Sequence, residues 1–177
     1  MKDNALEMLP LVDERGNVIG KATRGECHNG SHLLHPVVHL HVFNLQGKLY
    51  LQHRPAWKDV QPNRWDTAVG GHIDLGETPE QALLREAREE LGLSEFKATP
   101  LWQYVHTSPI ETEWVSSYYT VIPESTAIHP SEETDGGHFW EWEEIEQQLE
   151  LEVFTPNFVA EFKRLQQMRP SLHLPEK

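Results

Sequence analysis

Three glutamates, Glu86, Glu89 and Glu90, stand one helical turn apart in a segment whose apolar residues recur at helical spacing. Their side chains would therefore project from one side of a helix. Carboxylates this close repel one another unless a cation or an arginine lies among them. Oxygen ligands at this density suit a hard divalent ion, Mg²⁺ or Mn²⁺, bound together with a substrate phosphate. The alternative is a solvated acidic stripe paired with Arg85 and Arg88, and the helix alone does not separate the two.

The segment that carries these glutamates has clear helix ends. Thr78 is a capping residue, Pro79 suits the first helical position, and Gly92 is a typical stop. Before it, Gly70 and Gly71 let the chain turn sharply and bring backbone close to a ligand. The spacing thus predicts a loop, a helix and a second loop that together present the acidic side chains.

The rest of the chain mixes strand-like and helical patterns without a regular βαβ alternation. This mixture predicts an α+β sandwich with a mixed sheet. The expected strands are 9–13, 18–23, 37–44, 48–54, 65–69 (running into the two glycines), 102–106, 114–122 and 138–142, and the expected helices are 79–91, 143–149 and 155–168. We expect one domain over 1–177, with an N-terminal hairpin and His-rich loop at 1–35, a core at 36–150 and a C-terminal helix at 155–170.

Composition excludes several classes of protein. The net charge is −13, and residues 98–162 hold 13 acidic residues and no Lys or Arg, a surface that repels a nucleic-acid polymer. The single Cys excludes a disulfide framework and a multi-Cys zinc site. No apolar stretch is long enough for a membrane span, and the N-terminus lacks the apolar core of a signal peptide. We therefore expect a cytoplasmic protein that binds neither nucleic acid nor membrane.

The glutamate segment resembles the Nudix box in full. The pattern is Gly, five residues, Glu, seven residues, Arg-Glu, an apolar residue, any residue, Glu-Glu, any residue and Gly, and this chain supplies Gly71, Glu77, Arg85-Glu86, Glu89-Glu90 and Gly92. The only mild departure is small Ala87 at the first apolar position. Seven such positions coincide by chance in about one chain in 10⁵. The resemblance implies a mixed sheet between helices, with the box forming a loop-helix-loop.

The same resemblance implies metal-dependent hydrolysis of a diphosphate linked to another group. The metal ligands it implies are Glu86, Glu89, Glu90 and the Gly70 carbonyl. Arg85 would hold the glutamates in place and Glu77 would support the loop. A carboxylate of the helix, Glu89 or Glu90, or one on a later loop such as Glu132-Glu133, would take the proton of the attacking water.

A second resemblance, over roughly residues 9–120, is to type I isopentenyl diphosphate isomerase and its hydrolase-like relatives. The matching segments include Gly20-Lys21, Gln52-His53-Arg54, Trp65-Asp66-Thr67 and Gly71-His72. The metal ligands of that isomerase fall on His28, His35, His72, Glu111 and Glu113. Such a set would suit Zn²⁺ or Mn²⁺ better than Mg²⁺. Alternatively, these histidines make hydrogen bonds or contact substrate.

The isomerase also requires a Cys where this chain has Gly70, and without that acid/base group isomerisation loses a proton-transfer partner. A hydrolase of a nucleoside-diphosphate-X or similar small organic diphosphate is thus the first hypothesis, ahead of an isomerase-like enzyme and a non-catalytic ligand-sensing domain. Arg54, Lys58 and Arg64 are candidate phosphate ligands, with surface solubility the alternative. The sequence fixes neither the substrate nor the oligomeric state, so a homodimer stays open.

Overall fold

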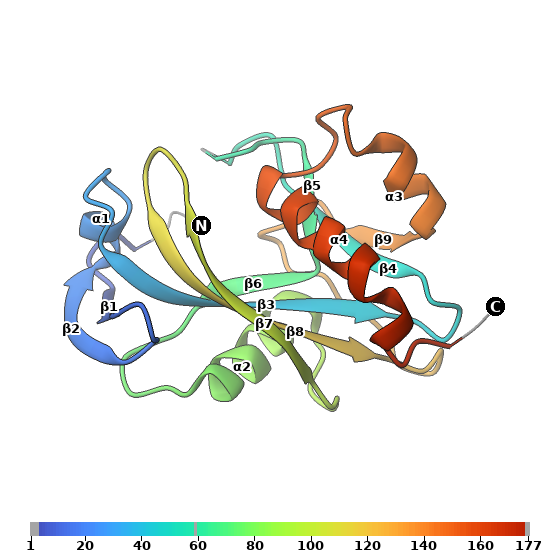
Figure 1. The fold of residues 1–177 in the computed structure, drawn as a ribbon, viewed down its shortest axis with the longest axis horizontal. Helices are drawn as coiled ribbons and strands as arrows, with labels where there is room; N and C mark the ends of the chain where they lie inside the picture. Colours follow the sequence, from blue (N-terminus) through green and yellow to red (C-terminus); the bar gives the residue numbers. More distant parts are fainter. Residues whose placement is uncertain (1–3, 59, 176–177) are drawn as a thin grey trace.

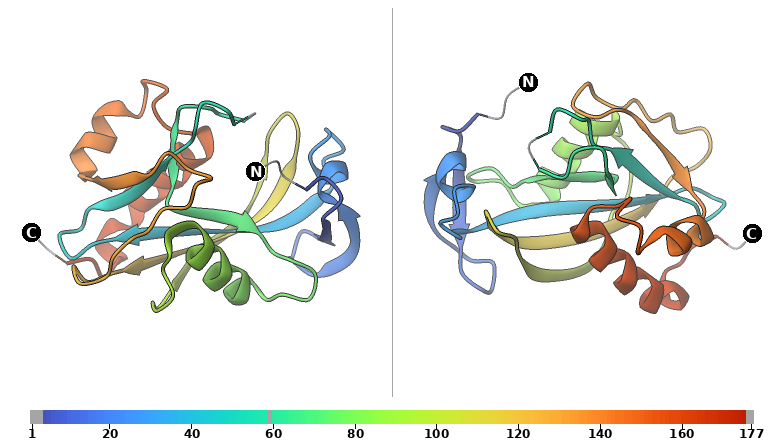
Figure 2. Two further views of the ribbon diagram at one scale, coloured as in Figure 1. Left: turned by 180° about the vertical axis from the view of Figure 1, so that it is seen from behind. Right: turned by 90° about the horizontal axis from the view of Figure 1, so that it is seen from above.

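The computed structural model describes residues 4–58 and 60–175, so the ends of the expected domain, 1 and 177, lie outside the described residues. The expected α+β architecture is confirmed: a mixed sheet has α2 (Pro79–Leu91) on one face and α4 (Pro156–Met168) on the other (Figure 1; Figure 2). The remaining helical elements are α1 (Arg24–Cys27), α3 (Trp142–Gln148) and the 3-10 turn η1 (Arg169–Ser171). No helix in the described part of the chain could span a membrane.

Seven strands form the main sheet, in the order β5-β4-β3-β8-β7, with β6 also pairing with β3 and β9 with β4. Among the strands of the described residues, only β3 and β8 pair in parallel, and their ten paired positions join the two halves of the chain. The hairpin β1–β2 is separate. The strands are β1 (Met8–Val12), β2 (Val18–Thr23), β3 (Leu34–Phe43), β4 (Leu49–His53), β5 (Trp65–Thr67), β6 (Val69–His72), β7 (Thr99–Thr107), β8 (Thr112–Val121) and β9 (Gly137–Trp140).

The glutamate helix α2 forms where the sequence predicts it. The Thr78 side chain accepts a hydrogen bond from the Gln81 backbone N–H, Pro79 occupies the first turn, and Gly92 ends the helix in the left-handed conformation at φ 65°. Its apolar face buries Leu83 and Leu91 against the sheet, each worth roughly 1.5–3 kcal/mol. That packing fixes which side of α2 meets the β6 strand.

Helix α4 covers the opposite face of the sheet with a second apolar cluster. Phe158, Phe162 and Leu165 are fully buried there, against β4, β9 and α3. The two clusters lie on either side of the sheet because successive residues of each strand point to opposite faces. A side chain of β3 therefore meets either α2 or α4, never both.

The expected strand at 65–69 is wrong in its extent. The chain forms β5 against β4, breaks at Ala68, and continues as β6 through Gly70 and Gly71 against β3. The break arises because the segment changes its pairing partner, which a periodic pattern does not reveal. Glycine is tolerated in β6 because another group approaches the backbone closely there.

Candidate active site and metal centres

The glutamate helix packs its carboxylates against the two glycines of β6. A Cβ at Gly71 would overlap the Glu86 carboxyl group, so this carboxylate can lie here only because residue 71 is glycine. One residue earlier, the Gly70 backbone N–H donates to Oε2 of Glu90 over 3.2 Å. The carboxyl groups of Glu86 and Glu90 thus pack against the backbone of the glycine pair, at the edge strand β6.

Burial makes this pair of carboxylates electrostatically costly. Burial raises the pKa of Glu86 to about 7, even though the adjacent Arg85 opposes the rise. Burial also raises the pKa of Glu90 well above its usual value, and the charge of Glu86 adds to the effect, as do those of Asp66 and Glu133. Two acids in this state favour a positive ion beside them.

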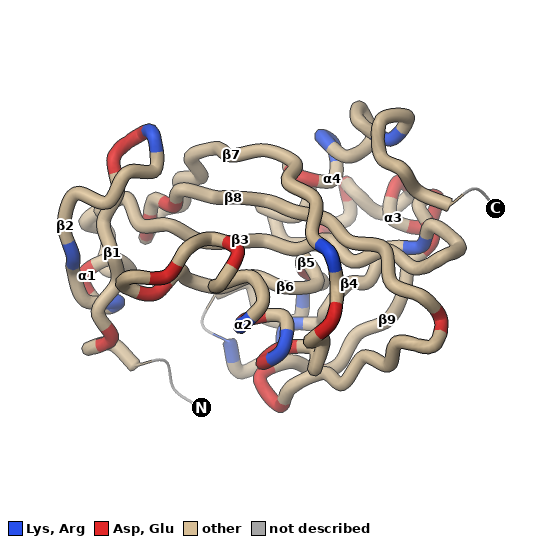
Figure 3. Tube along the Cα trace, turned by 90° about the horizontal axis from the view of Figure 1, so that it is seen from below, with Lys and Arg blue, Asp and Glu red and all other residues tan. Residues whose placement is uncertain are grey.

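The third carboxylate, Glu89, lies differently. Its side chain is 57% exposed, and one oxygen lies 3.5 Å from Nη1 of Arg85. Among residues 4–58 and 60–175, every set of potential metal ligands whose ligand atoms lie within 4.8 Å of one another contains histidine. Glu86, Glu89 and Glu90 therefore do not converge on one point in this conformation. Acidic and basic residues alternate along α2 (Figure 3). An ion held by all three glutamates therefore requires the exposed Glu89 side chain to turn inward.

Arg85 links the helix to the preceding loop. Its Nε and Nη2 donate to the two oxygens of Glu77 over 2.8 and 2.9 Å, and its Nη1 donates to Glu86 over 2.7 Å. Nη2 also donates to the carbonyl of His72 at 3.0 Å. The guanidinium lowers the pKa of Glu77, whose carboxylate also accepts the Asp74 backbone N–H. A planar, five-donor group is needed to bridge these partners at once.

The structure brings the expected histidines together. The imidazole rings of His28, His35 and His72 lie 5.1 to 5.4 Å apart, centroid to centroid. They come from the loop after α1, from β3 and from β6, and β3 pairs with both β6 and β8. Ligand atoms of the three rings lie within 4.8 Å of one another, as do those of His35, Glu111 and Glu113.

The donor atoms of this His/Glu cluster fit a cation. Nε2 of His28 lies 2.9 Å from Oε2 of Glu111. Yet these two atoms and Nε2 of His35 are buried without a well-formed hydrogen bond to any described residue. Burial lowers the pKa of His72 well below its usual value, which keeps that imidazole neutral, and burial raises the pKa of Glu113 to about 7. The Glu111 carboxylate raises the pKa of His35 against burial, so a metal bound there would displace a proton from that ring. Imidazoles and carboxylates that converge in this way are suited to metal ligation.

The three cationic residues expected to hold phosphate have other contacts. Nε and Nη2 of Arg54 donate to the Val60 carbonyl over 3.1 and 2.8 Å, and its Nη1 lies 3.4 Å from Asp66. Arg64 donates to the Phe154 carbonyl at 3.4 Å. The ammonium of Lys58 lies 4.8 Å from the centre of the neighbouring Trp57 ring. Arg54 and Arg64 thus use donors to hold backbone in place, and a phosphate-binding role for the three residues stays a prediction.

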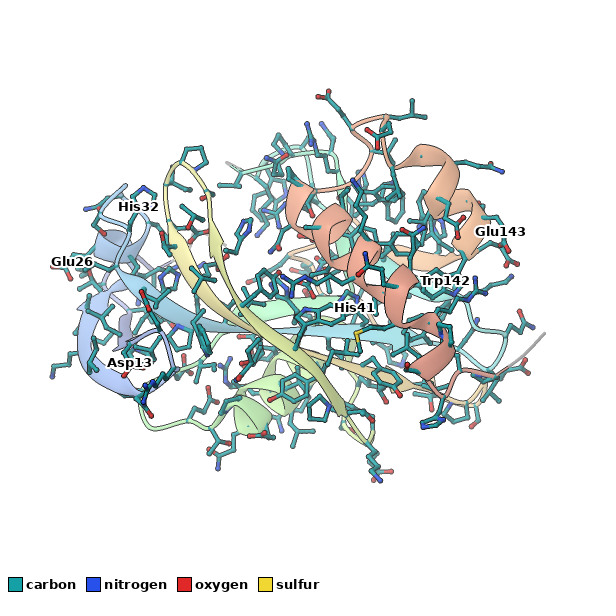
Figure 4. The ribbon with its side chains drawn as sticks, in the orientation of Figure 1. Asp13, Glu26, His32, His41, Trp142 and Glu143 are labelled. Carbon is teal, nitrogen blue, oxygen red and sulfur yellow. The ribbon has the colours of Figure 1, made fainter. Side chains whose placement is uncertain are left out.

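Sequence reasoning missed a buried polar cluster under α4. Glu161, with 0% exposure, accepts hydrogen bonds from Ser117 at 2.6 Å and Tyr104 at 2.8 Å and is paired with His39 and His41. Figure 4 places His41 between β3 and α4. The two histidines hold the Glu161 carboxylate in the core, and nothing in the local sequence indicates a partner 120 residues away.

The loop after β8 reaches the glutamate helix. The backbone N–H groups of His129 and Ser131 donate to the carbonyls of Leu91 and Glu90 over 2.8 and 2.9 Å. These bonds satisfy carbonyls at the C-terminal end of α2. They also place Glu133, one of the two acids expected on a later loop, where its charge affects Glu90.

Comparison with known proteins identifies the family. The sequence model of the NUDIX domain matches residues 33–162. An uncharacterized Nudix hydrolase of Streptomyces coelicolor is 32% identical over 171 residues, covering 96% of this chain and 93% of that protein. The chain belongs to the Nudix family. It is a Nudix hydrolase, a pyrophosphohydrolase of small molecules that contain a diphosphate.

Two further similarities bear on this hydrolase. An isopentenyl-diphosphate Delta-isomerase of Citrobacter koseri is 31% identical over 156 residues, covering 85% of this chain and 84% of the isomerase. The crystal structure of DR0079 from Deinococcus radiodurans superposes with a TM-score of 0.75 at 27% identity, covering 89% of this chain and 98% of that one. Both resemblances drawn from the sequence, to the Nudix family and to its isomerase branch, are thus confirmed.

Proposed function

We propose that this Nudix hydrolase cleaves the diphosphate linkage of a nucleoside-diphosphate-X or a similar small organic diphosphate, using Mg²⁺ or Mn²⁺ at the α2 glutamates. The observation that carries the proposal is the pair of half-buried carboxylates, Glu86 and Glu90, that lie against Gly71 and Gly70. This pair is half-buried, and the pKa of each member is raised, chiefly by burial.

The residues of the proposed site have three roles: binding the metal, holding a ligand in position and accepting a proton. Glu86, Glu89, Glu90 and the Gly70 carbonyl would hold the divalent ion, which when bound neutralises phosphate charge and lowers the pKa of water. Arg85, anchored on Glu77, keeps the Glu86 oxygen in place. A carboxylate of Glu89 or Glu90 accepts the proton of the attacking water. Glu89 has the freedom to do so because its side chain is exposed.

A second divalent ion in the cluster of His28, His35, His72, Glu111 and Glu113 is a separate proposal. Its support is the set of ligand atoms that face one another, three of which are buried without a well-formed hydrogen bond. Zn²⁺ or Mn²⁺ suits these ligands. Elemental analysis of the purified protein should find one such ion more in the wild type than in His35→Ala. Equal metal content in the two proteins would remove the second site.

Isomerisation is the weaker candidate in spite of the isomerase relatives. Residue 70 is glycine, and a Cβ there would lie 3.4 Å from the His39 ring, an ordinary contact, so the site would admit a side chain that the sequence does not provide. The only thiol, Cys27, is fully buried in α1, where it packs in the separate cluster of Leu9 and Ala22. The proton-transfer group that isomerisation requires is therefore missing on this side of the site.

A phosphate-release screen over nucleoside diphosphate derivatives, dinucleoside polyphosphates and prenyl diphosphates, with Mg²⁺ or Mn²⁺, tests the main proposal. On the best substrate, Glu90→Gln should lower kcat by about 10²- to 10⁴-fold while the melting temperature is kept. Glu95→Gln, at an exposed position, is the matched control and should leave kcat unchanged. A rate for Glu90→Gln within threefold of the wild type would remove its role. Absence of turnover on every substrate would favour a ligand-sensing domain.

A further inference from the structure

His39 lies directly opposite Gly70 in the main sheet. The two residues are paired across the antiparallel strands β3 and β6 (Figure 1). The Gly70 backbone N–H donates to Glu90 over 3.2 Å, away from β3, so His39 and Gly70 have no backbone hydrogen bond between them. In an antiparallel pair of this kind the two Cα atoms are only about 4.5 Å apart, and the side chains are close. The His39 ring thus lies beside the glycine whose backbone contacts the proposed metal site.

Glycine at position 70 leaves space in front of this ring. A Cβ built at Gly70 would lie 3.4 Å from Cδ2 of His39 and 3.7 Å from its Nε2. Apart from the chain neighbours of Gly70, no other atom of the described residues lies within 4 Å of that point. Gly70 is half-buried and 11% of the His39 side chain is exposed, so a small group can reach this space from solvent. A ligand oxygen placed there would contact Nε2.

The other ring nitrogen of His39 is held by Glu161. Nδ1 is bonded to Oε2 of Glu161, a carboxylate of α4 that has 0% exposure. The same carboxylate accepts from Ser117 at 2.6 Å and from Tyr104 at 2.8 Å, and it is bonded to His41 at 3.0 Å. Four side chains from three strands therefore fix the carboxylate, and the carboxylate fixes the orientation of the His39 ring.

The contacts of Glu161 place a positive charge on His39. A buried carboxylate requires a cationic partner, and the basic groups within 4 Å of its oxygens, in the described part of the chain, are the imidazoles of His39 and His41. The second nitrogen of His41, Nδ1, is buried without a hydrogen-bond partner, so a proton there would be unsatisfied. The second nitrogen of His39 faces the open space instead. A charged His39 ring therefore presents an N–H donor at Nε2.

This N–H has a position that suits an anionic oxygen. Nε2 of His39 makes no hydrogen bond to a described residue. The carboxylates of Glu113 and Asp66 are near enough for their charges to act on the ring, but neither is hydrogen-bonded to it. A charged donor without a protein acceptor binds phosphate oxygens well. One residue, Gly70, separates this donor from Glu90, so a diphosphate bound at the metal can reach it.

The geometry points to His39 as a substrate-binding residue whose Nε2–H donates to a phosphate oxygen of the diphosphate held by the metal at the α2 glutamates. This inference rests on the proposed function, because it adds a protein contact to the same diphosphate. His39 lies outside the Nudix box, which begins at Gly71. The contact is made to phosphate, so it strengthens binding of the diphosphate whatever organic group is attached.

Binding of methylene diphosphonate, whose carbon bridge resists hydrolysis, tests the contact without turnover. In isothermal titration calorimetry with the full chain and saturating Mn²⁺, His39→Asn should bind this probe about tenfold more weakly than the wild type, because a charge-assisted hydrogen bond is lost. Asn has a nitrogen in the place of Nδ1 and can still donate to Glu161, so the variant should keep its fold. His39→Gln, with a nitrogen in the place of Nε2, should recover part of the affinity. His41→Gln changes a histidine that is bonded to the same carboxylate but does not face Gly70, and it should leave the affinity within twofold.

The affinity for Mn²⁺ alone distinguishes a phosphate contact from a disturbance of Gly70. Without the probe, His39→Asn should bind Mn²⁺ as tightly as the wild type, as measured by electron paramagnetic resonance of the free ion. Equal affinity of His39→Asn and the wild type for methylene diphosphonate would overturn the inference. A loss of Mn²⁺ affinity as large as the loss of probe affinity would also overturn it, because His39 would then act through the metal site.

Turnover then separates this inference from the proposed function. On the best substrate of the phosphate-release screen, His39→Asn should raise KM about tenfold and keep kcat within threefold, since the contact is made in the bound substrate as well as in the transition state. An active wild type whose KM is unchanged by His39→Asn would overturn the inference and leave hydrolysis standing. Binding of methylene diphosphonate that depends on His39, in a wild type that hydrolyses no diphosphate, would overturn the proposed function and support the inference.

Discussion

Replacing Glu86 with Gln should make the metal-free protein more stable at alkaline pH. The pKa of Glu86 rises from 4.5 to about 7 on folding, chiefly because the group is buried. A folded carboxyl group with a raised pKa lowers stability once the pH exceeds the unfolded value, and the full loss is reached above the folded value. A rise of this size corresponds to about 3 kcal/mol at pH 8 and to almost nothing at pH 4.5.

Urea denaturation in EDTA, at pH 4.5 and pH 8, measures this effect. Glu86→Gln should unfold at a higher urea concentration than the wild type at pH 8, by up to about 3 kcal/mol in the free energy of unfolding, and at nearly the same concentration at pH 4.5. Gln keeps an oxygen that can accept from Arg85, so the 2.7 Å contact is weakened rather than removed. Glu95→Gln should show no difference at either pH.

Metal should largely cancel this difference in stability. At about a hundred times its dissociation constant, Mn²⁺ adds about 2.7 kcal/mol to a protein that binds it only in the folded state. The wild type should gain this stabilisation at pH 8 and Glu86→Gln should not. The reasoning would be refuted if Glu86→Gln were less stable than the wild type in EDTA at pH 8. It would also be refuted if Glu86→Gln exceeded the wild type in free energy of unfolding by the same amount at pH 4.5 and at pH 8. A variant that keeps the full Mn²⁺ gain would refute its role as a ligand.

Two further predictions concern Glu161, under α4, and Gly71, beside the Glu86 carboxyl group. Burial lowers the pKa of His39, but the charge of Glu161 outweighs it and raises this pKa from 6.5 to about 9. The resulting stabilisation is complete below pH 6.5 and is lost as the pH rises through 9, so the free energy of unfolding of the wild type should fall by roughly 3 kcal/mol between pH 6.5 and 9.5. Glu161→Gln should unfold at a lower urea concentration than the wild type at pH 6 and should not show this decline. Gly71→Ala should reduce kcat, because the new methyl group displaces the Glu86 carboxyl group. The free energy of unfolding should fall by about 1 kcal/mol at most, since the displaced group is the end of a flexible side chain. Gly20→Ala, where the nearest atom is 3.9 Å away, is the control, and equal kcat values for the two variants would contradict the assignment.

Local patterns in this chain predict local structure well. The Thr78 cap, Pro79 and Gly92 define α2 to the residue, and the box glutamates follow from their spacing on that helix. The hairpin of β1 and β2 and the start of α4 at Pro156 also follow from turn and capping residues. Such features depend on hydrogen bonds within a few residues, so a short window of sequence contains the whole cause.

Residues far apart in sequence behave differently. The bond from Tyr104 to Glu161 and the pairing of His53 with the Asp135 loop join segments 57 and more than 80 residues apart. The split of 65–72 into two strands also depended on which neighbours each half would find. No periodicity encodes such choices, because they are made by the parallel register of β3 with β8 and by which face of the sheet each helix covers.

By itself, then, the amino-acid sequence determined the helix of glutamates, its ends, and the family to which they belong, since every one of those features lies within a stretch of 23 residues, 71–93. Only the tertiary structure decided that Glu86 and Glu90 are half-buried against β6 while Glu89 faces solvent, and that the rings of His28, His35 and His72 meet. The physical reason is that burial and the pKa of a buried group depend on the atoms packed around it, and most of those come from strands distant in the chain.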